Sequence, residues 1–209
     1  MVTDIYGGIE FRHPWYGRDF YEGEPWVKAL DLWPLLEDGG LAGAYPAYAY
    51  LFGVRNGYAV DPIAPGRGLP DDVSKQLRGE LQPGIDDGEL VASWVLWSEL
   101  ADLDLGGPFG PYVAWIDGTD GGARHSAMLL PSGWGRADVE YAGPPPNLAE
   151  LATDQPYTWT HRLTTYTVRK LVLGDYFGPA TPWGHVFAVM RALGERFGDD
   201  HVRLVAAFD

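Results

Sequence analysis

Residues 181–209 read TPWGHVFAVMRALGERFGDDHVRLVAAFD, and this stretch decides the fold. Thr181 as N-cap, Pro182 in the first turn and Gly198 at the end predict a helix between them. Apolar side chains recur at the helical period along one face of it, at Trp183, Val186, Phe187, Met190, Leu193 and Phe197. Residues 202–208 are apolar on both faces, which predicts a fully buried strand.

The other end of the chain predicts the strand that pairs with it. From Asp4 to Arg12 apolar and polar residues alternate, and Gly7-Gly8 marks a bulge or a close backbone approach. Neither terminal strand can hide its faces alone, so we expect them in one sheet, adjacent to each other. The fold class is therefore α+β, with a mixed, largely antiparallel sheet covered by helices.

The intervening segments give weaker patterns. Pro25 to Glu37 and Ala44 to Gly53 have helix-like patterns, and Asp71 to Leu81 predicts a short helix capped by Asp71. We expect loops over Asn56–Pro70 and Pro83–Gly88, and then an apolar run over Leu90–Trp97 with helical turns from Ser98 to Leu103. Farther along the chain we expect a hairpin of Pro111–Asp117 with Ala123–Leu130, and a strand followed by a helix over Tyr157–Val172. We interpret residues 1–209 as one α+β domain, in which the stiff Gly143-Pro144-Pro145-Pro146 segment marks a subdomain junction near 143–147 if there are two.

Composition limits the function classes. The net charge is −14 and no run of basic residues occurs, which argues against binding to nucleic acid or an anionic membrane. The sequence has no cysteine and its five histidines show no ligand spacing, so we expect no metal and no cofactor. No secretory signal or apolar run of membrane-spanning length is visible, which predicts a cytoplasmic protein.

Candidate site residues come from the first strand and a loop rich in Pro and Gly. Asp4 and Tyr6 are the candidate catalytic pair, on the outer face of the first strand. Arg55 and Arg67 could clamp a carboxylate or phosphate, or could instead pair with some of the 29 acidic residues. Glu10 is a further candidate binding residue, or a solvated outer-face carboxylate, and Trp94 is a candidate aromatic contact. We expect a pocket with Asp4 and Tyr6 at its floor and Arg55 or Arg67 brought in by the loop.

Several blocks of sequence, in order along most of the chain, resemble an uncharacterised family of phage and bacterial proteins that begins Met-Gly-Cys-Asp-Ile-His. The blocks are residues 4–10, 51–56, 62–74, 93–100 and 200–209. The resemblance implies a shared organisation and no known activity. Thr3 stands where the family has Cys and Tyr6 where it has His, so a role that those two residues serve in the family would be absent here.

Three functions fit these observations. The first is a small-molecule-binding protein, because 9 Trp and 12 Tyr suit an aromatic-lined pocket. The second is a cofactor-independent enzyme that uses Asp, Tyr or His for acid–base chemistry in the same pocket. The third is an acidic inhibitor or immunity-type module for a protein partner with a basic surface. The sequence leaves the ligand and the oligomeric state open.

Overall fold

The computed structural model describes residues 4–36, 41–110, 114–120, 123–129, 147, 150–153 and 155–209, which fall into two compact units. One unit comprises Met1–Arg55, Asp61–Leu103 and Tyr176–Asp209, and the other Asn56–Val60 and Asp104–Asp175. Apart from Asn147, the expected junction near 143–147 lies outside the described residues. The single-domain interpretation stays a prediction.

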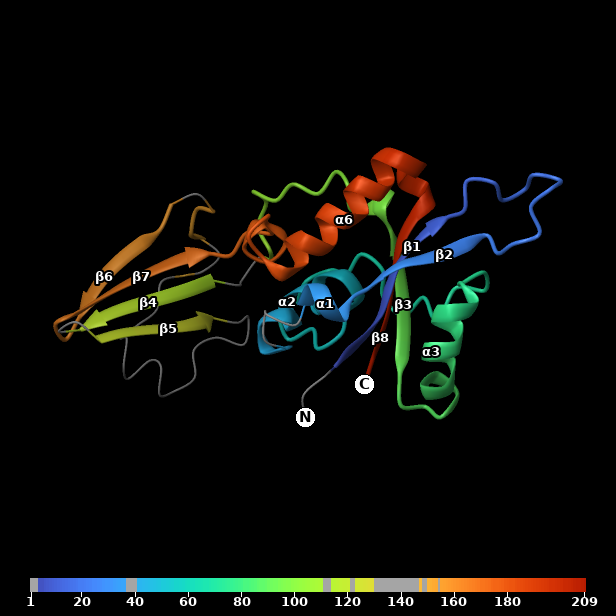
Figure 1. Cartoon of the computed structure of the whole chain (residues 1–209). Helices are drawn as coiled ribbons and strands as arrows, with labels where there is room; N and C mark the ends of the chain where they lie inside the picture. The colour runs from blue at the N-terminus through green and yellow to red at the C-terminus, as the bar shows by residue number, and fades with distance from the viewer. Residues whose placement is uncertain are drawn as a thin grey trace. The chain divides into compact units, whose positions relative to one another are not determined.

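The first unit is built on a four-stranded antiparallel sheet with the order β2-β1-β8-β3 (Figure 1). Its strands are β1 (Ile5–Arg12), β2 (Trp26–Asp31), β3 (Val91–Leu96) and β8 (Val202–Phe208). All seven residues of β8 are buried, as expected for a central strand covered on both faces. β1 and β8 are neighbours in register from Ile5 opposite Phe208 to Phe11 opposite Val202. The α+β class and the pairing of the terminal strands are therefore confirmed.

Helices cover both faces of this sheet (Figure 1). On one side lies α3 (Lys75–Asp86), whose buried Leu77 and Leu81 pack with Val205 and Ala207 of β8. On the other side lie α1 (Trp33–Leu36), α2 (Leu41–Phe52) and α6 (Pro182–Phe197). There the ring of Phe208 lies 5.4 Å from that of Tyr48. Because strand side chains alternate, β8 supplies apolar groups to both layers.

The predicted C-terminal helix is confirmed as α6. The Thr181 hydroxyl accepts a hydrogen bond from the Gly184 N–H at 2.9 Å, Pro182 begins the helix, and Gly198 follows it with φ +99°. The cap, the proline and the glycine each act within one helical turn. The apolar face of α6 is buried against the sheet.

The expected helix over Pro25–Glu37 is wrong in its first half. Residues 26–31 form β2 against β1, and among the described residues of this stretch only Trp33–Leu36 is helical. Pro34 disfavours a helix that passes through it but is tolerated in a first turn. Residues 26–31 form hydrogen bonds with the edge of β1. This pairing stabilises them more than their weak helical spacing of apolar residues stabilises a helix.

Helix α3 begins and ends later than expected. Its N-cap is Ser74, not Asp71, and it continues through Pro83 to Asp86 instead of giving way to a loop. The Ser74 hydroxyl accepts from the Leu77 N–H at 3.3 Å. The expected turn after β3 is the 3-10 helix η2 (Trp97–Glu99), which begins one residue before Ser98, and Glu99 accepts the Leu96 N–H at 2.9 Å.

The second unit contains a four-stranded antiparallel sheet with the order β5-β4-β7-β6. Its strands are β4 (Ala114–Asp120), β5 (Ala123–Leu129), β6 (Tyr157–His161) and β7 (Thr164–Lys170). The β4–β5 hairpin is confirmed. The helix expected in the second half of Tyr157–Val172 is wrong, because β7 is a strand whose Tyr166 stacks on its cross-strand partner Trp159, with ring centroids 5.2 Å apart. Along the chain, α5 (Gly174–Phe177) spans the boundary between the two units, and the 3-10 helix η4 (Asp199–His201) belongs to the first unit.

Candidate functional site

A pocket of about 440 Å³ lies where β1 extends past the end of β2. The register of these two strands ends at Gly8 opposite Asp31, so no residue of β2 lies opposite the first residues of β1. After Asp31 the chain bends, and the Leu32 N–H donates to the Gly7 carbonyl at 3.1 Å. We call this the β1-edge pocket, and it is lined by Asp4, Ile5, Tyr6, Gly7, Asp31, Trp33, Glu80 and Leu81.

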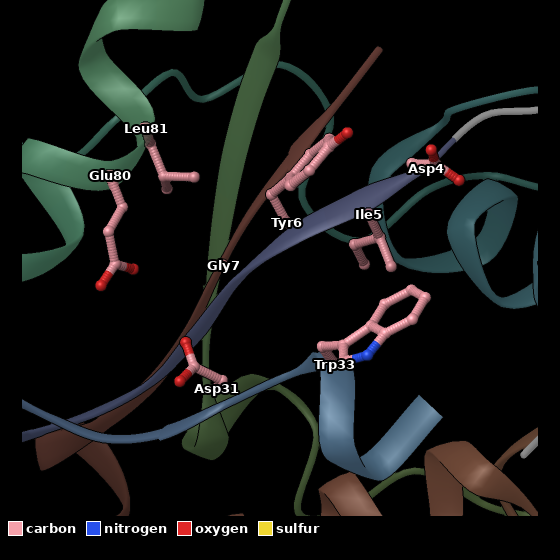
Figure 2. Close-up of a pocket in the computed structure, with 8 residues that line it drawn as sticks. All are labelled: Asp4, Ile5, Tyr6, Gly7, Asp31, Trp33, Glu80 and Leu81. Atoms are coloured by element: carbon pink, nitrogen blue, oxygen red, sulfur yellow. The ribbon is translucent and has the colours of Figure 1, made fainter. Parts of the chain in front are cut away.

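The β1-edge pocket receives side chains from both sides of β1. Figure 2 shows the Tyr6 ring on one side of the strand, with Ile5 and Trp33 on the other. This follows from the alternation of neighbouring side chains along a strand. Tyr6 and Trp33 are 44% and 51% exposed, so both rings are available to a ligand.

Gly7 permits the close packing of β1 at this point. Its φ is +127°, and a Cβ atom placed on it would lie 2.1 Å from the backbone oxygen of Val205 on β8. The close backbone approach expected at Gly7-Gly8 is confirmed, because no side chain fits between these strands.

Carboxylates outnumber cations in the β1-edge pocket. Asp31 and Glu80 share the Lys28 ammonium, whose side chain is 4% exposed and lies 2.5 Å from Glu80 Oε2. Asp4 has no cation within ion-pair distance in the part of the chain that the structure describes. Its backbone N–H donates to Asp209 Oδ1 at 2.8 Å, which adds another carboxylate nearby. The pocket therefore carries net negative charge.

Burial and the neighbouring carboxylates together set the protonation of two groups. Burial, reinforced by Asp4 and Asp209, raises the pKa of the Tyr6 phenol, so Tyr6 keeps its proton at neutral pH. Burial opposes the charge of Lys28, but its hydrogen bonds to Asp31 and Glu80 outweigh burial and raise its pKa. Lys28 is therefore an ammonium already held by two partners.

Of the residues predicted from sequence, Asp4 and Tyr6 line the β1-edge pocket and the two arginines do not. Arg67 forms a bidentate ion pair with Glu99, with distances of 2.8 and 2.6 Å, and lies over the ring of Trp94 at 5.1 Å. Arg55 is exposed in the turn after α2. The Pro/Gly loop thus places Arg67 beside Trp94, another of the predicted site residues. It does not place Arg67 at Asp4.

Glu10 is not a solvated outer-face carboxylate, since it is fully buried. Its Oε2 accepts from Arg203 Nε at 2.7 Å and its Oε1 from the Ser74 N–H at 2.9 Å. Arg203 also donates to Asp72 Oδ1 at 2.7 Å and lies over the ring of Trp26 at 3.8 Å. A buried charge requires such partners, and they make Glu10 part of the scaffold.

Arg67, Trp94, Arg203 and Trp26 line a second, more polar pocket of about 470 Å³, together with Arg12, Leu69, Pro70, Asp71, Asp72, Leu96 and Asp200. We call it the Arg–Trp pocket. Both Arg67 and Arg203 are neutralised by carboxylates there, which leaves little unbalanced charge for a ligand.

Sequence reasoning missed Asp31, Trp33 and Glu80 as site residues. A turn-rich segment between two candidate strands is typical of an antiparallel hairpin, and residues 13–25 contain two prolines and two glycines. Pairing residues 26–31 with β1 would have placed Asp31 and Trp33 beside Gly7. Nothing in the sequence signals Glu80, which reaches the pocket through the packing of α3.

Within the described ranges no three His, Asp or Glu side chains are arranged to hold a metal ion. Among the same residues no helix has the length and apolarity needed to cross a membrane. The expected absence of a metal stays a prediction.

Comparison with models of protein families, with curated proteins and with solved structures gave no match. The resemblance to the phage and bacterial family therefore also stays a prediction, and the function has to be argued from the β1-edge pocket itself.

Proposed function

We propose that this protein binds a small organic cation, an amine with an apolar body, in the β1-edge pocket. The observation that carries the proposal is the pairing of unbalanced carboxylate charge with two accessible rings. Asp4, which directly precedes β1, lacks a cation among the described residues, and Tyr6 and Trp33 lie on either side of that strand.

The size of the pocket supports a small molecule. Its volume of about 440 Å³ lies within the range of small-molecule sites, roughly 300–1,000 Å³. Apolar groups of Ile5, Leu81 and the rings can cover the body of a ligand. Carboxylates and aromatic faces both attract an ammonium group, and a ring contributes about 0.5–2 kcal/mol by the cation–π interaction.

The acid–base enzyme is less well supported by the same residues. A phenol whose pKa is raised is a poor general base at neutral pH, so Tyr6 serves better as a hydrogen-bond donor or a stacking surface. The enzyme and the acidic protein-binding module both stay predictions.

The test is a series of three probes of similar shape and different charge, titrated by calorimetry at low salt and pH 7. We expect 2-phenylethylamine to bind with a Kd of about 1 mM or below. We expect 2-phenylethanol to bind about tenfold more weakly and 3-phenylpropionate not to bind, because the carboxylates repel it. Equal binding of the amine and the alcohol, or tighter binding of the carboxylate, would overturn the proposal.

A further inference from the structure

A third pocket, of about 320 Å³, lies at the other end of β1 and has the opposite charge. Arg12 and His13, where β1 ends, and Tyr16 of the following loop form one wall. Arg196 and Phe197 at the end of α6, with His201 of η4, form the other. We call it the basic pocket. Among the described residues no acidic one lines it, although acidic residues outnumber basic ones 29 to 15 in the chain.

The two arginines of the basic pocket differ from the structural arginines elsewhere in this unit. Arg203 and Arg67 are each held by carboxylates. Over the residues that the structure describes, neither Arg12 nor Arg196 has a carboxylate within ion-pair distance. Their close partners are rings, since Arg12 lies 5.1 Å from the centroid of Tyr16 and Arg196 lies 5.9 Å from that of Phe197. Their charges are thus left for another partner.

The two walls of the basic pocket are fixed to each other. The rings of Phe11 and Phe197 stack with centroids 4.5 Å apart, which joins β1 to the end of α6. The His13 N–H donates to the Pro25 carbonyl at 2.8 Å and closes the base of the β1–β2 loop. Arg12 and Arg196 therefore flank the pocket before any ligand binds, which lowers the cost of ordering them.

Both imidazoles can present a nitrogen to a ligand. His13 Nδ1 accepts the Trp15 N–H at 3.3 Å, so the hydrogen of the neutral ring lies on Nε2, which is a donor. His201 Nδ1 lies 2.8 Å from the Phe197 carbonyl, which can only accept, so that Nδ1 carries a hydrogen. In the neutral ring its Nε2 therefore has no hydrogen and can only accept.

The neighbouring negative charges do not cancel this arrangement. Asp199 and Asp200 precede His201, but neither lines the basic pocket; Asp200 lines the Arg–Trp pocket, which shares Arg12 with the basic pocket. The last carbonyls of α6 carry partial negative charge, and one of them, that of Phe197, accepts from His201 Nδ1.

We propose that the basic pocket binds the phosphate group of a small phosphate monoester. Two guanidinium groups and the His13 Nε2–H offer more donors than the two oxygens of one carboxylate can accept, whereas a phosphate has three oxygens and nearly two negative charges. The Tyr16 ring, 45% exposed at the rim, can contact an aromatic or sugar substituent. The net charge of −14 repels a nucleic acid strand and so favours a small ligand.

Phenyl phosphate, titrated by calorimetry at pH 7, tests this proposal, with benzoate as the carboxylate probe. The pocket variants are Arg12→Gln and Arg196→Gln. The control is Arg191→Gln, which removes the same charge from α6, where Arg191 lies near the Trp97 ring and outside the pocket. Thermal unfolding of each variant establishes that it is folded.

We expect saturable binding of phenyl phosphate that weakens about tenfold or more in each pocket variant and less than about twofold in the control. Asp4→Asn should leave this binding unchanged, which separates the basic pocket from the β1-edge pocket. No saturable binding, or equal loss in Arg191→Gln, would overturn the site, and benzoate that binds as tightly as phenyl phosphate would overturn the assignment to a phosphate.

Discussion

Glu10 and Arg203 lie opposite each other on β1 and β8 and form an ion pair whose side chains are 0% and 3% exposed, with Oε2 and Nε 2.7 Å apart. This pair is placed by the register of the two terminal strands. It holds Asp72 and the ring of Trp26 beside the sheet, so it connects β1, β2, β8 and the segment that leads into α3. It belongs to the scaffold that supports both ends of β1.

Arg203→Met should therefore lower the free energy of unfolding by about 3–5 kcal/mol, because it leaves Glu10 charged and buried without a partner. Urea denaturation at pH 7 measures this loss. Arg67→Met is the matched control, since its pair with Glu99 is partly exposed and we expect a loss of about 1 kcal/mol or less. The double variant Glu10→Leu/Arg203→Met should recover at least half of the loss. A loss below about 1 kcal/mol in Arg203→Met would show that the pair is not structural.

Stability should fall in acid through Asp72 and Glu99. Partial burial alone would raise the pKa of Asp72, but hydrogen bonds from Arg203 and Trp26 outweigh it and lower this pKa. Hydrogen bonds from Arg67 lower the pKa of Glu99. A pKa lowered by folding stabilises the folded state above the unfolded pKa, about 4 for both groups, and this contribution is lost as the pH falls through 4 towards the folded value.

Urea denaturation of the wild type and Asp72→Asn at pH 6, 4.5 and 3 measures the contribution of Asp72. The difference in the free energy of unfolding should be largest at pH 6 and shrink by pH 3, because below the unfolded pKa the unfolded wild type takes up the proton that the folded state resists. A difference that is constant with pH, or that grows in acid, would contradict the role given to the Asp72 carboxylate.

Gly7→Ala should destabilise the protein by about 3 kcal/mol, because a positive φ and a clash with the Val205 backbone both oppose a side chain there. Gly79→Ala in α3 is the control with the opposite sign. A Cβ at Gly79 meets no atom within 4 Å, so the change should stabilise the helix by about 0.5–1 kcal/mol. Thermal unfolding compares the two, and an unchanged midpoint in Gly7→Ala would show that β1 can shift away from β8.

The sequence predicted the elements whose signals are local. The cap, proline and glycine of α6, and the apolar runs of β1 and β8, lie within a few residues of the structure that they specify. The strand β2 could not be found this way, because residues 26–31 become a strand through pairing with the edge of β1, which lies across a loop.

The candidate site was also predictable only where its residues lie close together in the sequence. Asp4 directly precedes β1 and Tyr6 lies in it, so their presence in one pocket follows from local sequence. The partners of charged residues depend on register and packing over long separations, such as Glu10 with Arg203 and Arg67 with Glu99. Sequence alone therefore placed Arg55 or Arg67 at Asp4 and missed Glu80.

The β1-edge pocket and its unpaired carboxylate are the centre of the functional account. The most direct measurement is the affinity of 2-phenylethylamine for three proteins by calorimetry at pH 7 and low salt: the wild type, Asp4→Asn and Asp61→Asn. Asp61 is an exposed aspartate outside the pocket, and its substitution removes the same charge. The account predicts that Asp4→Asn weakens binding about tenfold and that Asp61→Asn changes it less than about twofold. Both variants should have the melting temperature of the wild type. Equal affinity in all three proteins, or an equal loss in both variants, would contradict it.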